Sequence, residues 1–350
     1  MRIAFRLIFA VLALGLTFVI ARATVTTPAS AIVTPEKYRR GPEQTYLTYP
    51  EWFLVSSPAE LAVYLKTRPP SEFPFIGHIR QFWQGYEAVY DATKDTYPFN
   101  FGYHVMIIVI GTSTTVEYTL KYVYETMIGR LTELTRTHGM TEEDKFSAGV
   151  AQNYVDFIRV YPWYEYDFAG KLGQLWSDTS FFGPDMLRKW ERKYALTTEY
   201  GAKAIYGIVI KKLTRMSYEP PLMVTATLID SLPPNAQALL PELKVLKVLD
   251  DRSVLVTVPR YEAFMQNALV LAKLGVHFIE IAGNHGVILV TVLVPADWKP
   301  TNPAQVLFTQ PILSQPEIKR IVLKVQVAQL NQVLLDYSQA PFELEHVYDY

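Results

Sequence analysis

Cysteine is absent from this sequence of 350 residues. The chain therefore forms no disulfide, offers no thiolate to a metal ion and has no cysteine nucleophile. An excess of either charge is missing too, because 33 Lys and Arg residues stand against 34 Asp and Glu residues. The resulting net charge of −1 gives no general attraction for a phosphate backbone, so we expect no nucleic-acid partner.

Local motifs for common chemistry are missing as well. The sequence has no glycine-rich dinucleotide or phosphate loop, no G-x-S-x-G nucleophile elbow and no H-E-x-x-H zinc motif. Glu343 and His346 have the i, i+3 spacing of di-iron ligands, but such sites need a second pair and further carboxylates. We therefore expect no metal ion and no cofactor, and favour a protein that is not an enzyme. A catalytic site assembled from distant parts of the chain stays an open alternative.

An apolar run at residues 7–21 opens the chain, with Arg2 and Arg6 before it and Arg22 after it. As a helix it spans about 22 Å, less than the hydrocarbon core of about 30 Å. Ala21-Arg22-Ala23 resembles a signal-peptide cleavage site. The sequence thus predicts residues 1–23 as either a cleaved signal peptide or a membrane anchor. It places the rest outside the cytoplasm, secreted or anchored (at the inner membrane or in the periplasm of a bacterium).

A second apolar stretch, residues 101–120, is the other candidate for a membrane span. It contains His104 and Glu117, which are costly in lipid unless they are paired. Glu117, Lys121 and Glu125 follow at i, i+4 and i+8, which is typical of a solvated helix face. We favour a long soluble helix over residues 101–136.

Composition and periodicity divide the rest of the chain. Residues 24–44 are rich in Thr, Pro, Ala and Ser and indicate a linker, and residues 45–217 follow helical spacing throughout. Pro220-Pro221 precedes a change to strand-like patterns. The predicted segments after the linker are an all-helical domain at 45–217, an α/β domain at 218–296, a proline-containing connection at 297–313, and a C-terminal helix and tail at 314–350.

The element order after residue 218 is β-α-β-β-α-β-β. Its first six elements have the ferredoxin-like order, and residues 287–294 are expected to add an edge strand. Leu323, Val327, Leu330 and Leu334 have heptad spacing, although residues 321–327 also alternate like a strand; we favour a helix. The sequence predicts an α+β fold: an all-α N-terminal domain of long antiparallel helices, a small ferredoxin-like domain and a C-terminal helix.

Aromatic residues are abundant, with 23 Tyr, 18 Phe and 6 Trp. His104 shares one face of its predicted helix with aromatic and glycine positions, and an antiparallel neighbour would bring further aromatic rings to that face. The favoured interpretation is packing, in which glycine admits a Trp ring and His104 bonds to a Tyr hydroxyl. The alternative is a pocket for an apolar ligand, lined by Trp83, Tyr90, His104, Gly111, Tyr118 and Tyr122.

These observations favour a non-enzymatic envelope protein, anchored in the membrane or exported. Its N-terminal segment would contact the membrane, and the folded part would bind a partner protein, self-associate or scaffold a complex. The alternative function is a binding protein or sensor for an apolar or aromatic small molecule in the helical domain.

Overall fold

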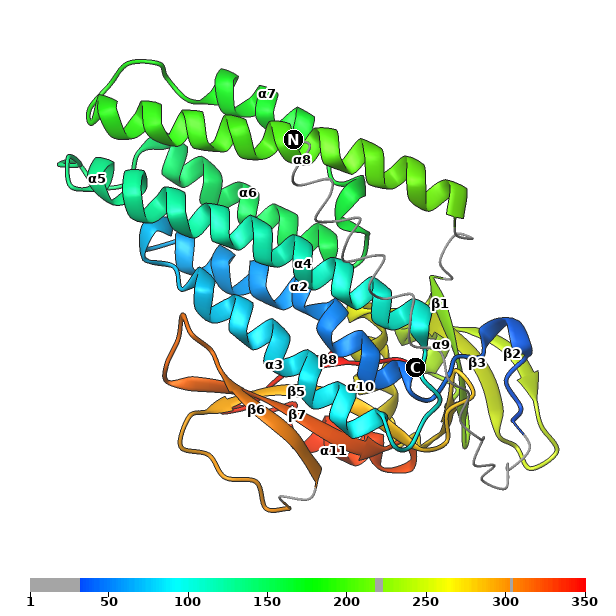
Figure 1. Ribbon diagram of the computed structural model, residues 1–350. Helices are drawn as coiled ribbons and strands as arrows, with labels where there is room; N and C mark the ends of the chain where they lie inside the picture. Colours follow the sequence, from blue (N-terminus) through cyan, green and yellow to red (C-terminus); the bar gives the residue numbers. More distant parts are fainter. Residues whose placement is uncertain (1–31, 218–222, 303–304) are drawn as a thin grey trace.

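A computed structural model describes residues 32–217, 223–302 and 305–350. The fold is α+β, with the helices first and two antiparallel four-stranded sheets after them, as the sequence predicts (Figure 1). The helical part contains η2 (Glu36–Tyr38), α2 (Gln44–Leu65), η3 (Pro70–Glu72), α3 (Phe75–Thr93), α4 (Phe101–Tyr124), η4 (Glu125–Gly129), α5 (Arg130–Glu133), α6 (Glu142–Ile158), η5 (Trp163–Glu165), α7 (Phe168–Asp178) and α8 (Met186–Ser217).

The long helix expected over residues 101–136 is present as α4, η4 and α5 in direct succession. The Asn100 side chain begins it by accepting a hydrogen bond from the Tyr103 backbone N–H at 3.2 Å. The η4 segment is a π-helical turn, which takes up an extra residue without ending the helix. Thr141 and Asp144 form a reciprocal capping box that begins α6.

The first sheet is built from β1 (Val224–Ile229), β2 (Lys244–Val248), β3 (Val254–Pro259) and β4 (Phe278–Ile281). Its strand order is β2-β3-β1-β4, and every neighbouring pair is antiparallel. Together with α9 (Ala236–Leu239) and α10 (Glu262–Lys273), this is the ferredoxin-like arrangement that the element order predicts.

A second sheet contains β5 (Val287–Pro295), β6 (Val306–Pro311), β7 (Ile318–Gln326) and β8 (Glu343–Val347) in the order β6-β7-β5-β8. Residues 287–294 were expected at the edge of the first sheet but form β5, an interior strand of the second sheet. The C-terminal helix is present as α11 (Leu330–Asp336), but it is short, because the residues before it form β7.

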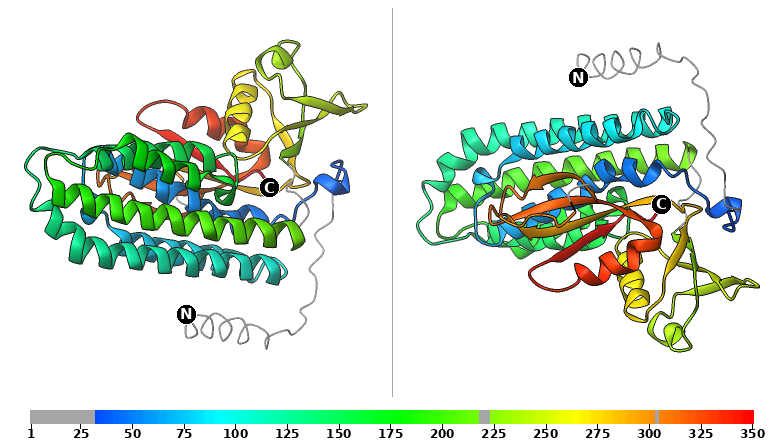
Figure 2. Two further views of the ribbon diagram at one scale, coloured as in Figure 1. Left: turned by 90° about the horizontal axis from the view of Figure 1, so that it is seen from above. Right: turned by 90° about the horizontal axis from the view of Figure 1, so that it is seen from below.

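Both faces of the second sheet are covered, which explains why β7 was mistaken for a helix. Figures 1 and 2 show the sheet beneath α2 and α3, with α8 on the opposite side of the helical layer. Leu289 of β5 belongs to the core shared with α2 and α3, whereas Val290 belongs to the core shared with α10 and α11. A strand buried on both faces lacks the alternation of polar and apolar residues and resembles a buried helix in sequence.

The expectation of a transmembrane helix is corrected by the structure. Within residues 32–217, 223–302 and 305–350, no helix is long and apolar enough to cross a membrane, and this search includes residues 101–120. The membrane assignment is therefore not supported. The apolar run at 7–21, on which the expectation of export rests, lies outside the described residues, so export stays a prediction.

Candidate functional site

His104 lies in a packed aromatic environment between α3 and α4. Its Nδ1 and the Tyr86 hydroxyl share a hydrogen bond of 2.9 Å. Phe99 stacks on the imidazole at a centroid distance of 4.4 Å, and Tyr90 meets it edge-on at 5.8 Å. Burial lowers the pKa of His104 below its usual value, so the ring is held neutral. The hydroxyl that bonds to His104 belongs to Tyr86, which lies one helical turn before Tyr90 on α3.

Trp83 and Gly111 meet where the sequence placed them. A Cβ atom on Gly111 would lie 2.9 Å from Cη2 of Trp83 and would also collide with the Phe82 ring. The Trp83 Nε1–H donates to Oγ1 of Thr115 at 3.0 Å. The space above Gly111 is therefore filled by two aromatic rings.

The remaining two predicted site residues lie elsewhere. Tyr118 is buried under α2, where its hydroxyl and Ser57 Oγ are 2.7 Å apart. Tyr122 is 42% exposed and lines a separate cavity. The structure thus brings Trp83, Tyr90, His104 and Gly111 together, as predicted from the antiparallel pairing of α3 and α4, and leaves the two tyrosines outside that group.

Ser57, His78 and Glu60 form a cluster that sequence reasoning missed. Ser57 Oγ lies 2.9 Å from His78 Nδ1, and His78 Nε2 lies 3.6 Å from Glu60 Oε2. Burial, aided by the nearby Arg320 charge, lowers the pKa of His78 to about 3. Burial raises the pKa of Glu60 to about 7, although Arg320 opposes that shift.

This order of serine, imidazole and carboxylate is the one used by serine hydrolases. However, Ser57 is only 1% exposed, and its Oγ is held on one side by Tyr118 and on the other by His78. Phe73 also stacks on His78 at 4.6 Å. A substrate cannot reach the serine in this arrangement, so the geometry supports a packing role for the cluster.

An ion-pair chain connects this cluster to the second sheet. Arg320 of β7 donates from Nη2 to Glu60 at 3.2 Å and binds both oxygens of Glu345 at 2.6 Å. A guanidinium bound between two carboxylates in this way fixes β7 and β8 to α2. Arg320 and Glu60 are 260 residues apart in the sequence, so no local motif could predict their ion pair.

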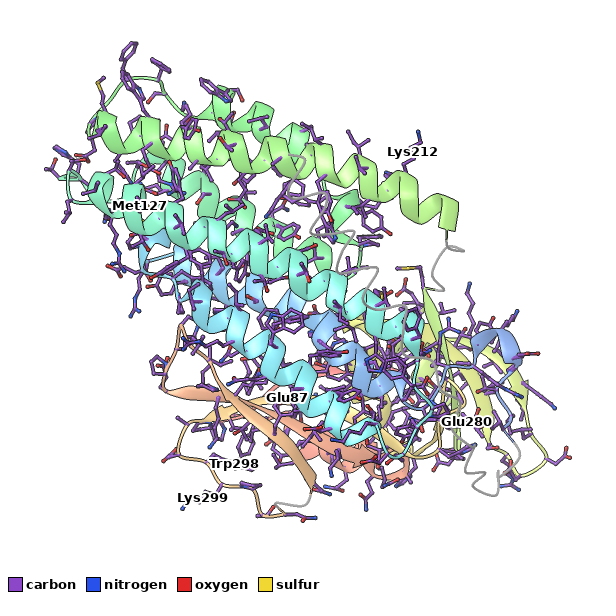
Figure 3. The ribbon with its side chains drawn as sticks, in the orientation of Figure 1. Glu87, Met127, Lys212, Glu280, Trp298 and Lys299 are labelled. Carbon is purple, nitrogen blue, oxygen red and sulfur yellow. The ribbon has the colours of Figure 1, made fainter. Side chains whose placement is uncertain are left out.

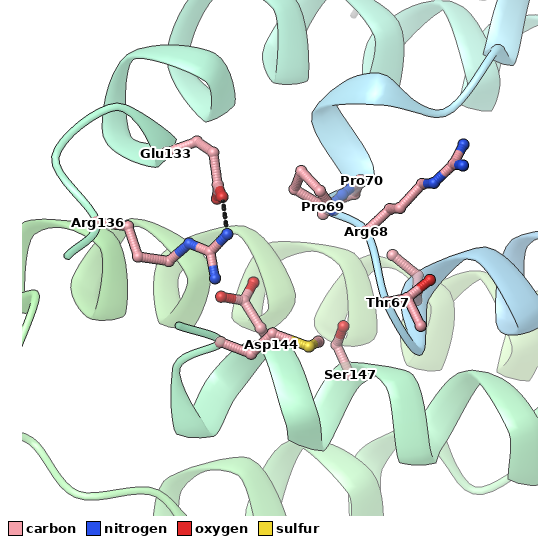
Figure 4. A pocket seen from close by; sticks show the side chains of 10 residues that line it. Thr67, Arg68, Pro69, Pro70, Glu133, Arg136, Asp144 and Ser147 are labelled. Atoms are coloured by element: carbon pink, nitrogen blue, oxygen red, sulfur yellow. Dashed lines mark ion pairs between the residues drawn. The ribbon is translucent and has the colours of Figure 1, made fainter. Parts of the chain in front are cut away.

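Two cavities open on the helical part. The smaller holds about 20 Å³, enough for one water molecule, and lies beside the ion pair of Glu133 and Arg136 (Figure 4). The larger holds about 280 Å³ between the start of α3 and the π-helical turn η4. Its lining includes Phe73, Phe75, Arg80, Tyr122, Glu125 and Arg130.

Among the described residues, the longest row of exposed apolar side chains runs along α4, η4 and α5. We call it the α4 stripe. Its side chains are 46–83% exposed and recur every three, four or seven residues: Val109, Val116, Leu120, Val123, Met127, Leu131 and Leu134. Figure 3 shows Met127 on the outer side of this helix. Exposed apolar residues on α8 form two separate groups instead, around Leu187 to Tyr194 and around Ile205 to Val209.

The charged residues of α4, Glu117 and Lys121, pair with residues of α8 and stay partly exposed. Lys121 Nζ lies 3.1 Å from Glu117 and 2.8 Å from Glu199, and Lys203 closes the ring with both glutamates. Burial raises the pKa of Glu199, but Lys121 and Lys203 outweigh it and hold that pKa well below its usual value. The predicted solvated charge ladder is therefore an interhelical ion network, and the outer face of α4 is left apolar.

Among the described parts of the chain, no group of three or more His, Asp or Glu side chains is placed to hold a metal ion. Comparison of the chain with protein-family models, with curated proteins and with solved structures found no match.

Proposed function

We propose that this protein is a non-enzymatic binding protein that works by assembly with a protein partner through the α4 stripe. The observation that carries the proposal is the stripe itself, which runs over more than twenty residues of α4, η4 and α5 and is interrupted between Val109 and Val116 by exposed Thr112 and Ser113. Contiguous exposed apolar surface of this kind is typical of protein interaction sites.

The size of the stripe supports a specific interface. Side chains of these sizes at these exposed fractions present roughly 100 Å² each, so seven give on the order of 700 to 800 Å². The largest apolar patch of an ordinary monomer measures about 300–600 Å², whereas a standard interface buries about 800 Å² per partner. The stripe fits the second value better.

A photoreactive amino acid at Val116 tests the proposal in the intact producing cell. We expect irradiation to give a discrete cross-linked product of higher mass, because Val116 lies within the stripe and would contact the partner. Lys299 is exposed on the far side of the second sheet and provides the control position (Figure 3). Equal labelling at both positions, or none at Val116, would contradict the proposal.

The larger cavity supports a second candidate function, the binding of a small aromatic anion. Phe73, Phe75 and Tyr122 give it aromatic walls, and Arg80 and Arg130 stand at its border. Across the part of the chain that the structure describes, neither arginine is paired with a carboxylate. An aromatic carboxylate could stack on these walls and pair with a guanidinium.

Benzoate is a suitable probe for this second candidate. We expect millimolar benzoate to raise the melting temperature of the wild-type chain, and expect the shift to vanish in Arg130→Gln. Arg68→Gln removes an arginine outside this cavity, one that lies over the Tyr64 ring, and should retain the shift. No shift in the wild type, or the same shift in both variants, would rule the cavity out as the site.

A further inference from the structure

The spacing of the α4 stripe identifies the kind of partner it fits. Val109 and Leu134 are equally far from the midpoint between residues 121 and 122. The same holds for Val116 with Met127, and for Leu120 with Val123. Six of the seven stripe residues are therefore symmetric about this midpoint, and Leu131 is the exception, because its mirror position is Thr112. The three symmetric pairs are the pattern that an antiparallel copy of the same helix complements.

A two-fold axis through that midpoint would place six of the seven stripe residues opposite other stripe residues, and Leu131 opposite Thr112. A twofold interface uses the same patch on both subunits, and every contact then occurs twice. The paired length from Val109 to Leu134 is about 38 Å at 1.5 Å per residue. A partner of unrelated sequence would have no reason to match this internal symmetry.

The charges also favour the antiparallel arrangement. In this register Ser113 lies opposite Arg130, and Thr126 lies opposite Glu117, so no like charges meet across the pairs. A parallel, in-register pair would place Arg130 opposite its own copy, which is destabilising. Glu117 and Lys121 are already neutralised by α8 within each subunit.

We infer that the partner of the α4 stripe is a second copy of this chain, bound antiparallel about an axis between residues 121 and 122. The inference rests on the proposed function and adds the identity and the register of the partner. The resulting dimer would be a scaffold in which two sets of sheets point away from a central helix pair.

Because the chain has no cysteine, introduced thiols report on this register without interference. The double variant Val109→Cys, Leu134→Cys should form a disulfide-linked dimer under mild oxidation. Each single variant should stay uncross-linked, because its two copies lie at opposite ends of the interface. Cross-linking of both single variants would indicate a parallel pair and overturn the inference. Leu239→Cys, exposed on α9, is the control and should not cross-link.

Sedimentation of the unmodified chain provides a second measurement that does not depend on cysteine. We expect the mass of two chains, and expect Leu120→Glu to raise the dissociation constant about 100-fold, since the new carboxylates meet near the axis. Leu239→Glu should leave the mass unchanged. Melting curves verify that each variant is folded.

The two proposals fail in different ways. A monomeric chain whose Val116 photoproduct contains a different protein would overturn the dimer and leave the binding function in place. A monomeric chain with no Val116 photoproduct would overturn both.

Discussion

At the residue scale, two histidines are held neutral inside the molecule. His78 is fully buried beside Ser57, and His346 of β8 is stacked under Trp52 at a ring-centroid distance of 3.5 Å. Burial, together with the Arg260 charge, lowers the pKa of His346 to about 3, as burial and Arg320 do for His78. Above a pH of about 3, each imidazole therefore binds a proton only after the chain unfolds.

These shifts predict acid sensitivity. Between pH 6.5 and 3 the unfolded chain binds more protons than the folded chain at each histidine, so the free energy of unfolding decreases as the pH falls. Each histidine removes about 2 kcal/mol between pH 6.5 and 5. Glu60 acts in the opposite sense, because its raised pKa makes the folded state the stronger proton acceptor between its usual value and about 7.

The variant His346→Gln isolates one of these contributions. Urea denaturation at pH 7 and pH 5 should show that the variant loses about 2 kcal/mol less stability on acidification than the wild type does. Because the free energies of unfolding at pH 7 and pH 5 are compared within the same protein, the pH-independent effect of the substitution on stability cancels. An identical loss in both proteins would mean that His346 does not titrate on unfolding.

Gly111 offers a second test at the residue scale. Its missing Cβ leaves room for Phe82 and Trp83, so Gly111→Ala should lower the free energy of unfolding by about 1–3 kcal/mol. Gly149 lies in the middle of α6 with nothing within 4 Å of its Cβ position, and Gly149→Ala should raise stability by up to about 1 kcal/mol. If instead both substitutions stabilise the protein in thermal melts, the α3–α4 contact is not as close as described.

The sequence was sufficient to predict contacts between elements that are neighbours along the chain. It was not sufficient to predict contacts between elements that are far apart in the sequence. Helical spacing and one turn put Trp83 against Gly111 and Tyr90 near His104. The partners of His78 could not be found in this way, because Ser57 and Glu60 lie on a different helix and Arg320 lies in β7. Nothing in a local pattern reports which buried polar groups meet across the core.

At the element scale, α8 is held by buried ion pairs. Arg188 has no exposed surface and contacts Glu191 at 3.0 Å, Asp144 at 3.1 Å and Glu133 at 3.2 Å. Its neighbour Arg192 lies 2.7 Å from Glu125, in the π-helical turn. These pairs tie α8 to α5, α6 and η4, where an apolar interface would be expected between long helices.

Arg188→Met should therefore leave three carboxylates without their shared cation. We expect a loss of about 3–5 kcal/mol in the free energy of unfolding, because removing one partner from a buried ion network leaves charges that water cannot solvate. Lys94→Met removes the lysine of the exposed pair with Asp91 and should leave the denaturation midpoint close to that of the wild type. Similar midpoints for the two variants would show that the Arg188 network contributes little.

Element prediction failed for β7, which is buried on both faces, although β5 is buried in the same way and was predicted as a strand. The helix periodicity of α3 and α6 could be recognised in the sequence because each helix has a polar side. β7 was not recognised as a strand for two reasons. Apolar Val322 interrupts the alternation of Ile321, Leu323 and Val325, and Leu323 is also the first residue of the heptad spacing that indicated a helix. The competing signal, β-branched residues at consecutive positions, favoured the strand that the structure contains.

At the scale of the whole molecule, the two sheets share one core. Buried residues of the first sheet, such as Val256 and Phe278, belong to the same cluster as Val290 of β5 and Leu323 of β7. Arg260 at the end of β3 is tied to Asp349, beyond β8, at 3.2 Å. The boundaries predicted at 218–296 and 297–313 stay a prediction, and the shared core indicates how they can be tested.

A protease site inserted after Thr301 would cut the connection between β5 and β6, which are both strands of the second sheet. We expect the two fragments to stay together in gel filtration, because β5 pairs with β7 along nine residues from Val287 to Pro295 and with β8 on its other edge. They should separate only in denaturant. Replacing Val290 and Leu323 together with Ala removes apolar contacts on both sides of this cut, and should make the cut fragments separate at lower urea concentrations than those of the cut parent. If the cut parent already separates without denaturant, the pairing of β5 with β7 and β8 does not hold the fragments together, and the boundary near residue 297 is a true domain boundary.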